Sequence, residues 1–303
     1  MNLVQIGIPR ALLYYRYGGL WKSFLRGLGL EIVLSPETDE AILERGLVCV
    51  SSEVCLPIKI IAGHLLYLRD CVDTIFFPRL DYLYDGLYAC PKMIGIVDVA
   101  RMVLGEKVRL IAPTIGGNFN RAHLSAGLQI CPNPVRVWQA WQRAKRDCLS
   151  ALKRDSDDIG WGELKSKRVG LIGHFYNIGD RFISEPVVRT FEQNGYSLIT
   201  KEDLSPSVLL SRQGFARNIR WVYERELYNA FEFLLDKVAG FCIIVSMGCG
   251  PDSLVVEFMR ERARITGVPL LVLVIDEHTG YTGLVTRVEA FVEFLQRGNK
   301  IGK

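Results

Sequence analysis

Apolar and polar positions along the 303-residue chain predict strands and helices in regular succession. Short apolar runs that stop at Pro, Gly or polar residues indicate strands, and apolar residues recurring every three or four positions indicate helices. In the first half we predict strands at 4–8, 31–34, around Cys49, 74–77 and 108–112. The helices predicted between and after these strands span 11–28, 39–44, 58–68, 92–104, 122–130 and 135–152. For the helix at 39–44, Thr38 is the expected cap and Arg45-Gly46 the expected stop.

The second half has the same character. Its predicted strands are 168–172, 196–200, 241–245 and 269–275, and its predicted helices are 187–194, 221–237, 254–263 and 284–297. A polar segment from Asp155 to Lys167 separates the halves and predicts two domains, 1–158 and 159–303. Alternation of strand and helix predicts an α/β fold: two Rossmann-like domains with parallel sheets flanked by helices.

Composition narrows the class of protein. Hydrophobic residues make up 49% and charged residues 23% of the chain, which indicates a packed globular protein. The net charge of +4 is small and dispersed, so we expect no nucleic-acid partner. No apolar run reaches the ~18 residues of a membrane helix and no secretory leader is evident, so we expect a cytoplasmic protein without membrane contact. In that compartment eight cysteines favour metal or redox chemistry over disulfides.

Three cysteines share one local pattern. Cys249 follows the apolar run 241–245 and precedes a helix that Pro251 opens; Cys55 and Cys90 also stand beside a proline at the predicted start of a helix. Cys131 is a weaker fourth case, because the segment before it looks helical. Helix N-termini favour thiolates and other anions, so these cysteines are candidate ligands of an iron–sulfur cluster.

The alternative is that cysteines serve as small buried hydrophobes. We assign that role to Cys49, Cys71, Cys148 and Cys242, and it stays open for the candidate ligands.

Two loops that follow predicted strands carry further candidates. In Ile275-Asp-Glu-His-Thr-Gly280, Glu277 and His278 are candidates for proton transfer or metal binding. The alternative is a polar turn in which Asp276 or Thr279 caps the last helix. In the loop that begins at His174, Tyr176 and Asn177 either contact a ligand or shape the loop. The glycine-rich segment Ile115-Gly-Gly-Asn118 lacks a P-loop pattern, so we expect no ATP hydrolysis by this chain.

Several motifs in order resemble the activase-associated proteins related to 2-hydroxyacyl-CoA dehydratases. They cover nearly the whole chain and are Ile6-Gly-Ile-Pro-Arg-Ala-Leu12, Leu34-Ser-Pro-Glu-Thr38, Cys55-Leu-Pro-Ile-Lys59, Phe77-Pro-Arg79, Cys90-Pro-Lys92, Cys249-Gly-Pro-Asp-Ser253, Ile275-Asp-Glu-His-Thr-Gly280 and Thr286-Arg-Val-Glu-Ala-Phe291. The resemblance implies an oxygen-sensitive 4Fe-4S cluster in the cleft between two α/β domains, served by an ATP-dependent activase. Cys55, Cys90 and Cys249 fall on the family's motif cysteines. Some related proteins carry two linked cubanes instead.

We therefore expect an iron–sulfur redox protein of this class. It would accept low-potential electrons from an activase or another donor and reduce a small-molecule or acyl-CoA substrate, or a partner. A non-catalytic electron carrier or cluster-handling protein is the first alternative, and a metal-free acyl-CoA-binding module is the second. The fourth iron is either open or held by Cys131, and we favour the open site because Cys131 has no preceding strand.

Overall fold

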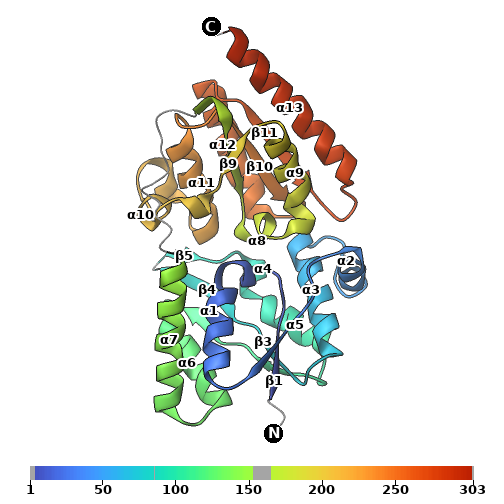
Figure 1. Cartoon of the computed structure of the whole chain (residues 1–303), viewed down its shortest axis with the longest axis vertical. Coiled ribbons are helices and arrows are strands. Elements are labelled where there is room, and N and C mark those ends of the chain that lie inside the picture. Colours follow the sequence, from blue (N-terminus) through green and yellow to red (C-terminus); the bar gives the residue numbers. More distant parts are fainter. Residues whose placement is uncertain (1–3, 85, 153–164, 302–303) are drawn as a thin grey trace. The chain divides into compact units, whose positions relative to one another are not determined.

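The computed structural model describes residues 4–84, 86–152 and 165–301. The chain divides into two compact units, Met1–Arg154 and Asp155–Lys303. Each unit has a parallel sheet flanked by helices (Figure 1), which confirms the predicted α/β class with two Rossmann-like units. The predicted boundary between residues 158 and 159 lies outside the described residues.

The first unit is built on a four-stranded parallel sheet in the order β2-β1-β3-β6. Its strands are β1 (Gln5–Ile8), β2 (Glu31–Leu34), β3 (Thr74–Phe76) and β6 (Arg109–Ile111). All four were predicted at nearly these bounds, because each is a short apolar run that ends at a polar residue or proline. The chain starts at β1, goes to β2 on one side and then returns past β1 to β3, so its direction reverses between β1 and β3.

Two layers of helices enclose this sheet (Figure 1). One layer pairs α1 with α7 and α6 with α7, and the other packs α3 against both α2 and α5. The helix predicted over 92–104 divides at Gly95 into α4 and α5. The helices of this unit are α1 (Tyr14–Gly27), α2 (Glu40–Leu47), α3 (Leu56–Arg69), α4 (Pro91–Ile94), α5 (Ile96–Leu104), α6 (Phe119–Ile130) and α7 (Pro134–Leu152).

A second, three-stranded sheet in the first unit was not predicted. Its order is β5-β4-β7, with β4 antiparallel to β5 and parallel to β7. The strands are β4 (Arg79–Tyr84), β5 (Leu87–Tyr88) and β7 (Thr114–Gly116). Two of them have only two or three residues, which is too few for a hydrophobic period to stand out.

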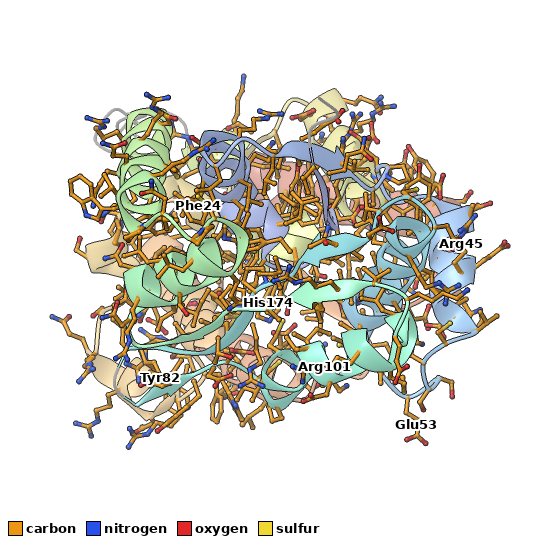
Figure 2. The ribbon with its side chains drawn as sticks, turned by 90° about the horizontal axis from the view of Figure 1, so that it is seen from below. Phe24, Arg45, Glu53, Tyr82, Arg101 and His174 are labelled. Carbon is orange, nitrogen blue, oxygen red and sulfur yellow. The ribbon has the colours of Figure 1, made fainter. Side chains whose placement is uncertain are left out.

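The strand predicted around Cys49 is wrong. Helix α2 continues through Gly46 to Leu47, and residues 48–55 form an irregular loop. Val48 is 83% exposed, and Glu53 projects from the outside of this loop (Figure 2). The apolar residues of this segment resemble those of a strand, but no neighbouring strand among the described residues pairs with it.

The start and stop predicted for α2 are also wrong. Asp39 is the N-cap, with its side chain accepting a hydrogen bond from the Ile42 N–H, while the Thr38 hydroxyl bonds buried His64 at 3.1 Å. Gly46 does not end the helix, because it lies where α2 crosses α3. A Cβ on Gly46 would meet the Lys59 carbonyl oxygen, and a Cβ on Gly63 would meet that of Ile42.

The second unit repeats the strand order of the first. Its parallel sheet runs β11-β10-β8-β9, with β8 (Arg168–Gly173), β9 (Ser197–Ile199), β10 (Gly240–Ser246) and β11 (Leu270–Ile275). Every residue of β8 and β10 is buried, as expected for the two central strands. The reversal of direction here lies between β8 and β10.

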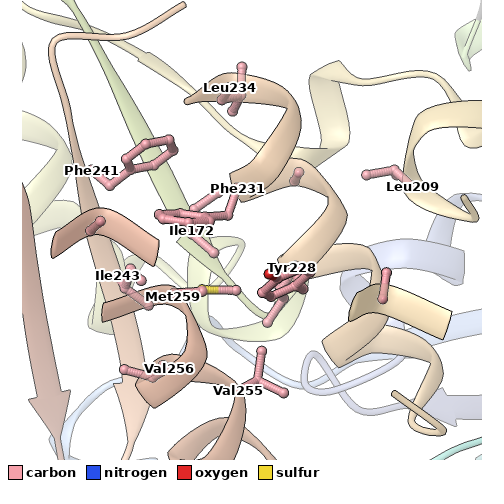
Figure 3. Close-up of a cluster of buried hydrophobic side chains, with 14 of the residues drawn as sticks. Ile172, Leu209, Tyr228, Phe231, Leu234, Phe241, Ile243, Val255, Val256 and Met259 are labelled. Atoms are coloured by element: carbon pink, nitrogen blue, oxygen red, sulfur yellow. The ribbon is translucent and has the colours of Figure 1, made fainter. Parts of the chain in front are cut away.

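Helices α9 and α13 pack together in one layer of this unit, and α10, α11 and α12 pack in the other. Between that second layer and the sheet lies a hydrophobic core (Figure 3), in which the rings of Phe231 and Phe241 lie 4.5 Å apart. None of the helices described here is long and apolar enough to cross a membrane. The helices are α8 (Phe175–Ile178), α9 (Arg181–Gln193), α10 (Pro206–Leu209), α11 (Val222–Leu234), α12 (Gly250–Thr266) and α13 (Tyr281–Ile301).

The crossing of α2 and α3 generates a stability prediction. In Gly63→Ala the new methyl group meets a backbone carbonyl, which cannot move without parting the helices, so we expect a loss of about 1–3 kcal/mol of unfolding free energy. The matched control is Gly19→Ala, at an exposed position in α1 with open space around it. There we expect a gain of roughly 0.5–1 kcal/mol. Urea unfolding measures both, and equal effects would contradict the close contact.

A buried histidine ties three elements of the first unit together. His123 Nδ1 lies 2.7 Å from the Phe119 carbonyl oxygen, and its Nε2 accepts a hydrogen bond from Trp21 Nε1–H at 3.0 Å. Its ring stacks on Trp141 at 4.6 Å. Only the neutral tautomer with its proton on Nδ1 satisfies both bonds. Burial lowers the pKa of His123 to about 4, against a smaller opposing contribution from the Phe119 carbonyl.

Because His123 is buried in its neutral form, we expect the protein to lose stability in acid. Its pKa is lower in the folded than in the unfolded state, so its stabilising effect is complete above pH 6.5 and is lost as the pH falls toward 4. The loss approaches about 3 kcal/mol. His123→Gln keeps a donor and an acceptor but does not titrate, so its unfolding free energy should fall less steeply over this range. Urea unfolding followed by tryptophan fluorescence at several pH values measures the slopes, and identical slopes would refute the assignment.

Candidate functional site

The reversal of strand direction in the second unit brings three functional side chains together. Open α/β sheets bind ligands outside the carboxyl ends of their strands at such a point. His174 directly follows β8, and Cys249 follows β10 after a turn in which Gly248 has a φ of +76°. Asp252 lies in the first turn of α12, which Cys249 caps.

His174, Cys249 and Asp252 form a candidate metal centre. One ligand atom from each lies within 4.8 Å of the other two, and all three side chains are buried. Among the described residues, these three are the His, Cys, Asp or Glu side chains that lie close enough together, as a group of three or more, to hold one metal ion. Imidazole, thiolate and carboxylate together suit zinc or iron.

Charge holds this group in place. His174 Nε2 lies 2.9 Å from Asp252 Oδ1 and 3.6 Å from Glu224 Oε1 of α11. The imidazole ring also stacks on the ring of Tyr176 at 4.7 Å. Burial by itself lowers the pKa of His174, but Asp252 and then Glu224 raise it by more, so the net pKa is raised. The carboxyl groups of Asp252 and Glu224 thus favour the protonated form of the imidazole.

Glu224 is a buried carboxylic acid, so its charged form is disfavoured. Burial raises the pKa of its carboxyl to about 7, although His174 opposes this shift. Behind it a second buried pair joins Lys201 Nζ to Glu226 Oε2 at 2.7 Å. The first turns of α11 thus carry two carboxyl groups inside the unit, each facing a basic side chain.

Several buried polar atoms of this region lack a hydrogen-bond partner among the described residues: Nδ1 of His174, Nδ2 of Asn177 and Oδ2 of Asp252. Asn177 is otherwise fixed, because its Oδ1 accepts a hydrogen bond from Ser246 Oγ at 3.2 Å. An unsatisfied buried polar group costs about 1–3 kcal/mol. Their concentration around Cys249 favours a bound group at this position.

The prediction that three cysteines begin helices is confirmed. Cys55 is the N-cap of α3, Cys90 of α4 and Cys249 of α12, each with an extended backbone and a proline at the first or second helical position. Cys249 caps the helix that directly follows the third strand of its unit, whereas β4 and β5 lie between β3 and the helix that Cys90 caps. That all three bind one cluster stays a prediction, because Cys55 and Cys90 belong to the first unit and Cys249 to the second.

The other cysteines occupy varied positions. Cys131 is the half-buried C-cap of α6 and lies three residues before the first residue of α7. Cys242 is fully buried in β10, where burial raises the pKa of its thiol. The buried role is wrong for Cys71, which is exposed at the end of α3, while Cys49 and Cys148 are half-buried.

The loop 276–280 is a closed polar turn. Thr279 Oγ1 accepts a hydrogen bond from the Asp276 N–H and donates one to Asp276 Oδ1. His278 is exposed and Glu277 half-buried, at the carboxyl end of β11 beside β10. A chemical role for Glu277 and His278 stays a prediction.

Sequence reasoning missed His174, Glu224 and Asp252 as a group. His174 had a usable signal, because it follows a strand at the same level as the Cys249 turn. Asp252 lies in the first turn of a helix, where an acidic residue is common for other reasons. Glu224 gave no signal, since a charged pair at 224–226 in a long helix is normally exposed.

Comparison with protein families gives a match over most of the chain. Residues 5–204 match the family described as CoA enzyme activase uncharacterised domain (DUF2229). The match includes Cys55, Cys90, Cys131 and His174 and stops before β10. A search of curated proteins found no match.

If His174, Cys249 and Asp252 form a metal centre, the chain should bind a divalent metal ion through these residues of the second unit. Co²⁺ added to the metal-free chain should give an absorption band of thiolate–cobalt contact. Cys249→Ser and Asp252→Asn, which preserve shape, should each weaken Co²⁺ binding by at least about tenfold. Cys242→Ser is the matched control, since Cys242 is equally buried on β10 but outside the group. Equal binding by all variants would rule out the centre.

Proposed function

The chain belongs to this activase-associated family, which is related to the 2-hydroxyacyl-CoA dehydratases, and we propose that it is an iron–sulfur redox protein of that class. Its ligands are Cys55, Cys90 and Cys249, holding a 4Fe-4S cluster or one of two linked cubanes. An ATP-dependent activase or another low-potential donor supplies electrons. The chain passes them to a small-molecule or acyl-CoA substrate, or to a partner.

The observation that carries the proposal is the shared position of the three cysteines. Each is an N-cap with an extended backbone, at the end of a helix toward which the first N–H groups point. Those N–H groups and the helix dipole stabilise negative charge, and a cluster with its thiolates is anionic. The residues present therefore fit the group that the family implies.

A cluster so held supplies one-electron transfer at low potential. The chain's own residues supply the rest. His174 and Asp252 fix each other beside Cys249 and keep that position closed to solvent, since all three side chains are buried. Glu277 and His278, at the carboxyl end of the adjacent strand, are the proposed proton-transfer groups.

The fourth ligand has two sources within the chain. Cys131 is half-buried before α7, and His174 lies in the group with Cys249. If neither binds, the fourth iron is open to substrate. Electron transfer alone needs no open position, whereas activation of a substrate at iron does.

One observation favours a second candidate. His174, Cys249 and Asp252 form a mixed donor set inside a single unit, and this set suits one zinc or iron ion without any residue of the first unit. The chain would then bind a mononuclear metal, and Cys55 and Cys90 would have no part in it.

Iron and sulfide analysis of protein purified without oxygen separates these candidates. The cluster predicts iron together with sulfide, and loss of most of both in Cys55→Ser, Cys90→Ser and Cys249→Ser. The matched control is Cys71→Ser, an exposed cysteine at the other end of α3, which should keep its iron. Cys131→Ser reports on the fourth ligand.

The alternatives give different patterns. A mononuclear centre would contain no sulfide and would survive Cys55→Ser and Cys90→Ser. Metal-free protein from a strictly anaerobic preparation would overturn the proposal in favour of an acyl-CoA-binding module.

A further inference from the structure

Exposed arginines gather on the segment between α10 and α11 in the second unit. Arg212, Arg217 and Arg220 are exposed, and no carboxylate in the described ranges forms an ion pair with any of them. Arginines on the neighbouring helix α12 differ, because Arg260 pairs with Glu257 and Arg264 with Glu261. The segment therefore carries uncompensated positive charge.

This segment is fixed to α11 by buried side chains. Arg225, 3% exposed, donates from Nε to the Ile219 carbonyl at 3.0 Å. Asn229 Nδ2 donates to the carbonyls of Leu209 and Ser211 at 2.8 and 3.0 Å. Burial lowers the pKa of Arg225, and the charges of Arg212 and Arg220 lower it further, as expected if they lie near it. A segment ordered before binding loses little entropy when a partner docks.

Apolar side chains continue the surface toward the candidate centre. Phe215 packs on Phe258 of α12 with ring centroids 4.1 Å apart. Leu254 is 50% and Phe258 38% exposed, and their i,i+4 spacing puts them on one face of α12. Leu254 lies five residues after Cys249, or about 8 Å along the helix axis.

We infer that Arg212, Phe215, Arg217, Arg220, Leu254 and Phe258 form a docking surface for an acidic electron-donor protein. The inference rests on the proposed function, because it assigns a place to the donor. An apolar centre beside charged residues is the usual composition of a protein interface. Positive charge without internal partners steers a negatively charged protein to this face. The donor is the reductant: each encounter oxidises it by one electron and reduces the chain by one, and no bond forms or breaks.

A charge-reversal pair tests the surface. The probe is a small acidic 4Fe-4S ferredoxin, and its Kd for the chain is measured without oxygen at low and at high salt. Arg217→Glu/Arg220→Glu should raise the Kd by at least about tenfold at low salt, with a smaller effect at high salt. The matched control is Arg181→Glu/Arg189→Glu, an equal charge change on α9 in the other helical layer, where both arginines pair with Glu185. It should change the Kd less than about twofold.

A second variant tests the surface independently, in case the charge reversal disturbs folding. A third variant distinguishes failure of the docking surface from failure of the proposed function. Leu254→Ser removes exposed apolar surface and should raise the dissociation rate several-fold. Cys249→Ser should bind the ferredoxin as the natural chain does, although it accepts no electrons. Normal docking without electron transfer in the natural chain would therefore count against the proposed function and leave the surface intact. Equal loss of affinity in both double variants, or no binding by the natural chain, would overturn the surface.

Discussion

The buried contact of His174 with Asp252 is the constraint on which the second unit's site depends. It joins the end of β8 to the first turn of α12, the two segments that follow the central strands. Two charges removed from water are stable only when each has a close partner. A second carboxyl group, that of Glu224 on α11, lies 3.6 Å from the same His174 Nε2, and the buried Lys201 and Glu226 pair with each other. Cys249 is held where these elements meet.

The repeated strand order gives both units the same reversal of direction next to their first strand. In the orders β2-β1-β3-β6 and β11-β10-β8-β9, the chain returns past its first strand to reach its third. A helix that follows the third strand then starts at the carboxyl end of the sheet, next to the reversal point. Cys249 caps a helix of this kind. Cys90 does not, because β4 and β5 separate its helix from β3, and Cys55 caps a helix of the crossover from β2 to β3. The crowded approach of Gly46 and Gly63 in turn lets α2 lie close on α3, whose N-terminus Cys55 forms.

Local signals made the main sheets and the cysteine caps predictable. Apolar runs ending at polar residues located β1, β8 and β10 within a residue or two, and a proline beside each cysteine located the helix starts. What failed depends on contacts distant in sequence. Thr38 looked like a cap, but its hydroxyl bonds His64, and Gly46 looked like a stop because only its packing partner on α3 shows why glycine is needed. Glu224 could not be found, because nothing near it in the chain reveals that its environment is buried.

The backbone of the cysteine caps depends on neighbours in sequence, and their surroundings depend on neighbours in space. Proline at the first or second helical position has a fixed φ and lacks an N–H, so it sets the first turn without losing a hydrogen bond. The residue directly before proline is confined to extended backbone, as Cys90 is at φ −65° and ψ 155°. Proline thus sets the backbone of Cys90 directly, while after Cys55 and Cys249 one residue stands between the cysteine and the proline of the first turn. Which other residues each cysteine meets is decided by the sheet, and for Cys249 those residues are a histidine and an aspartate.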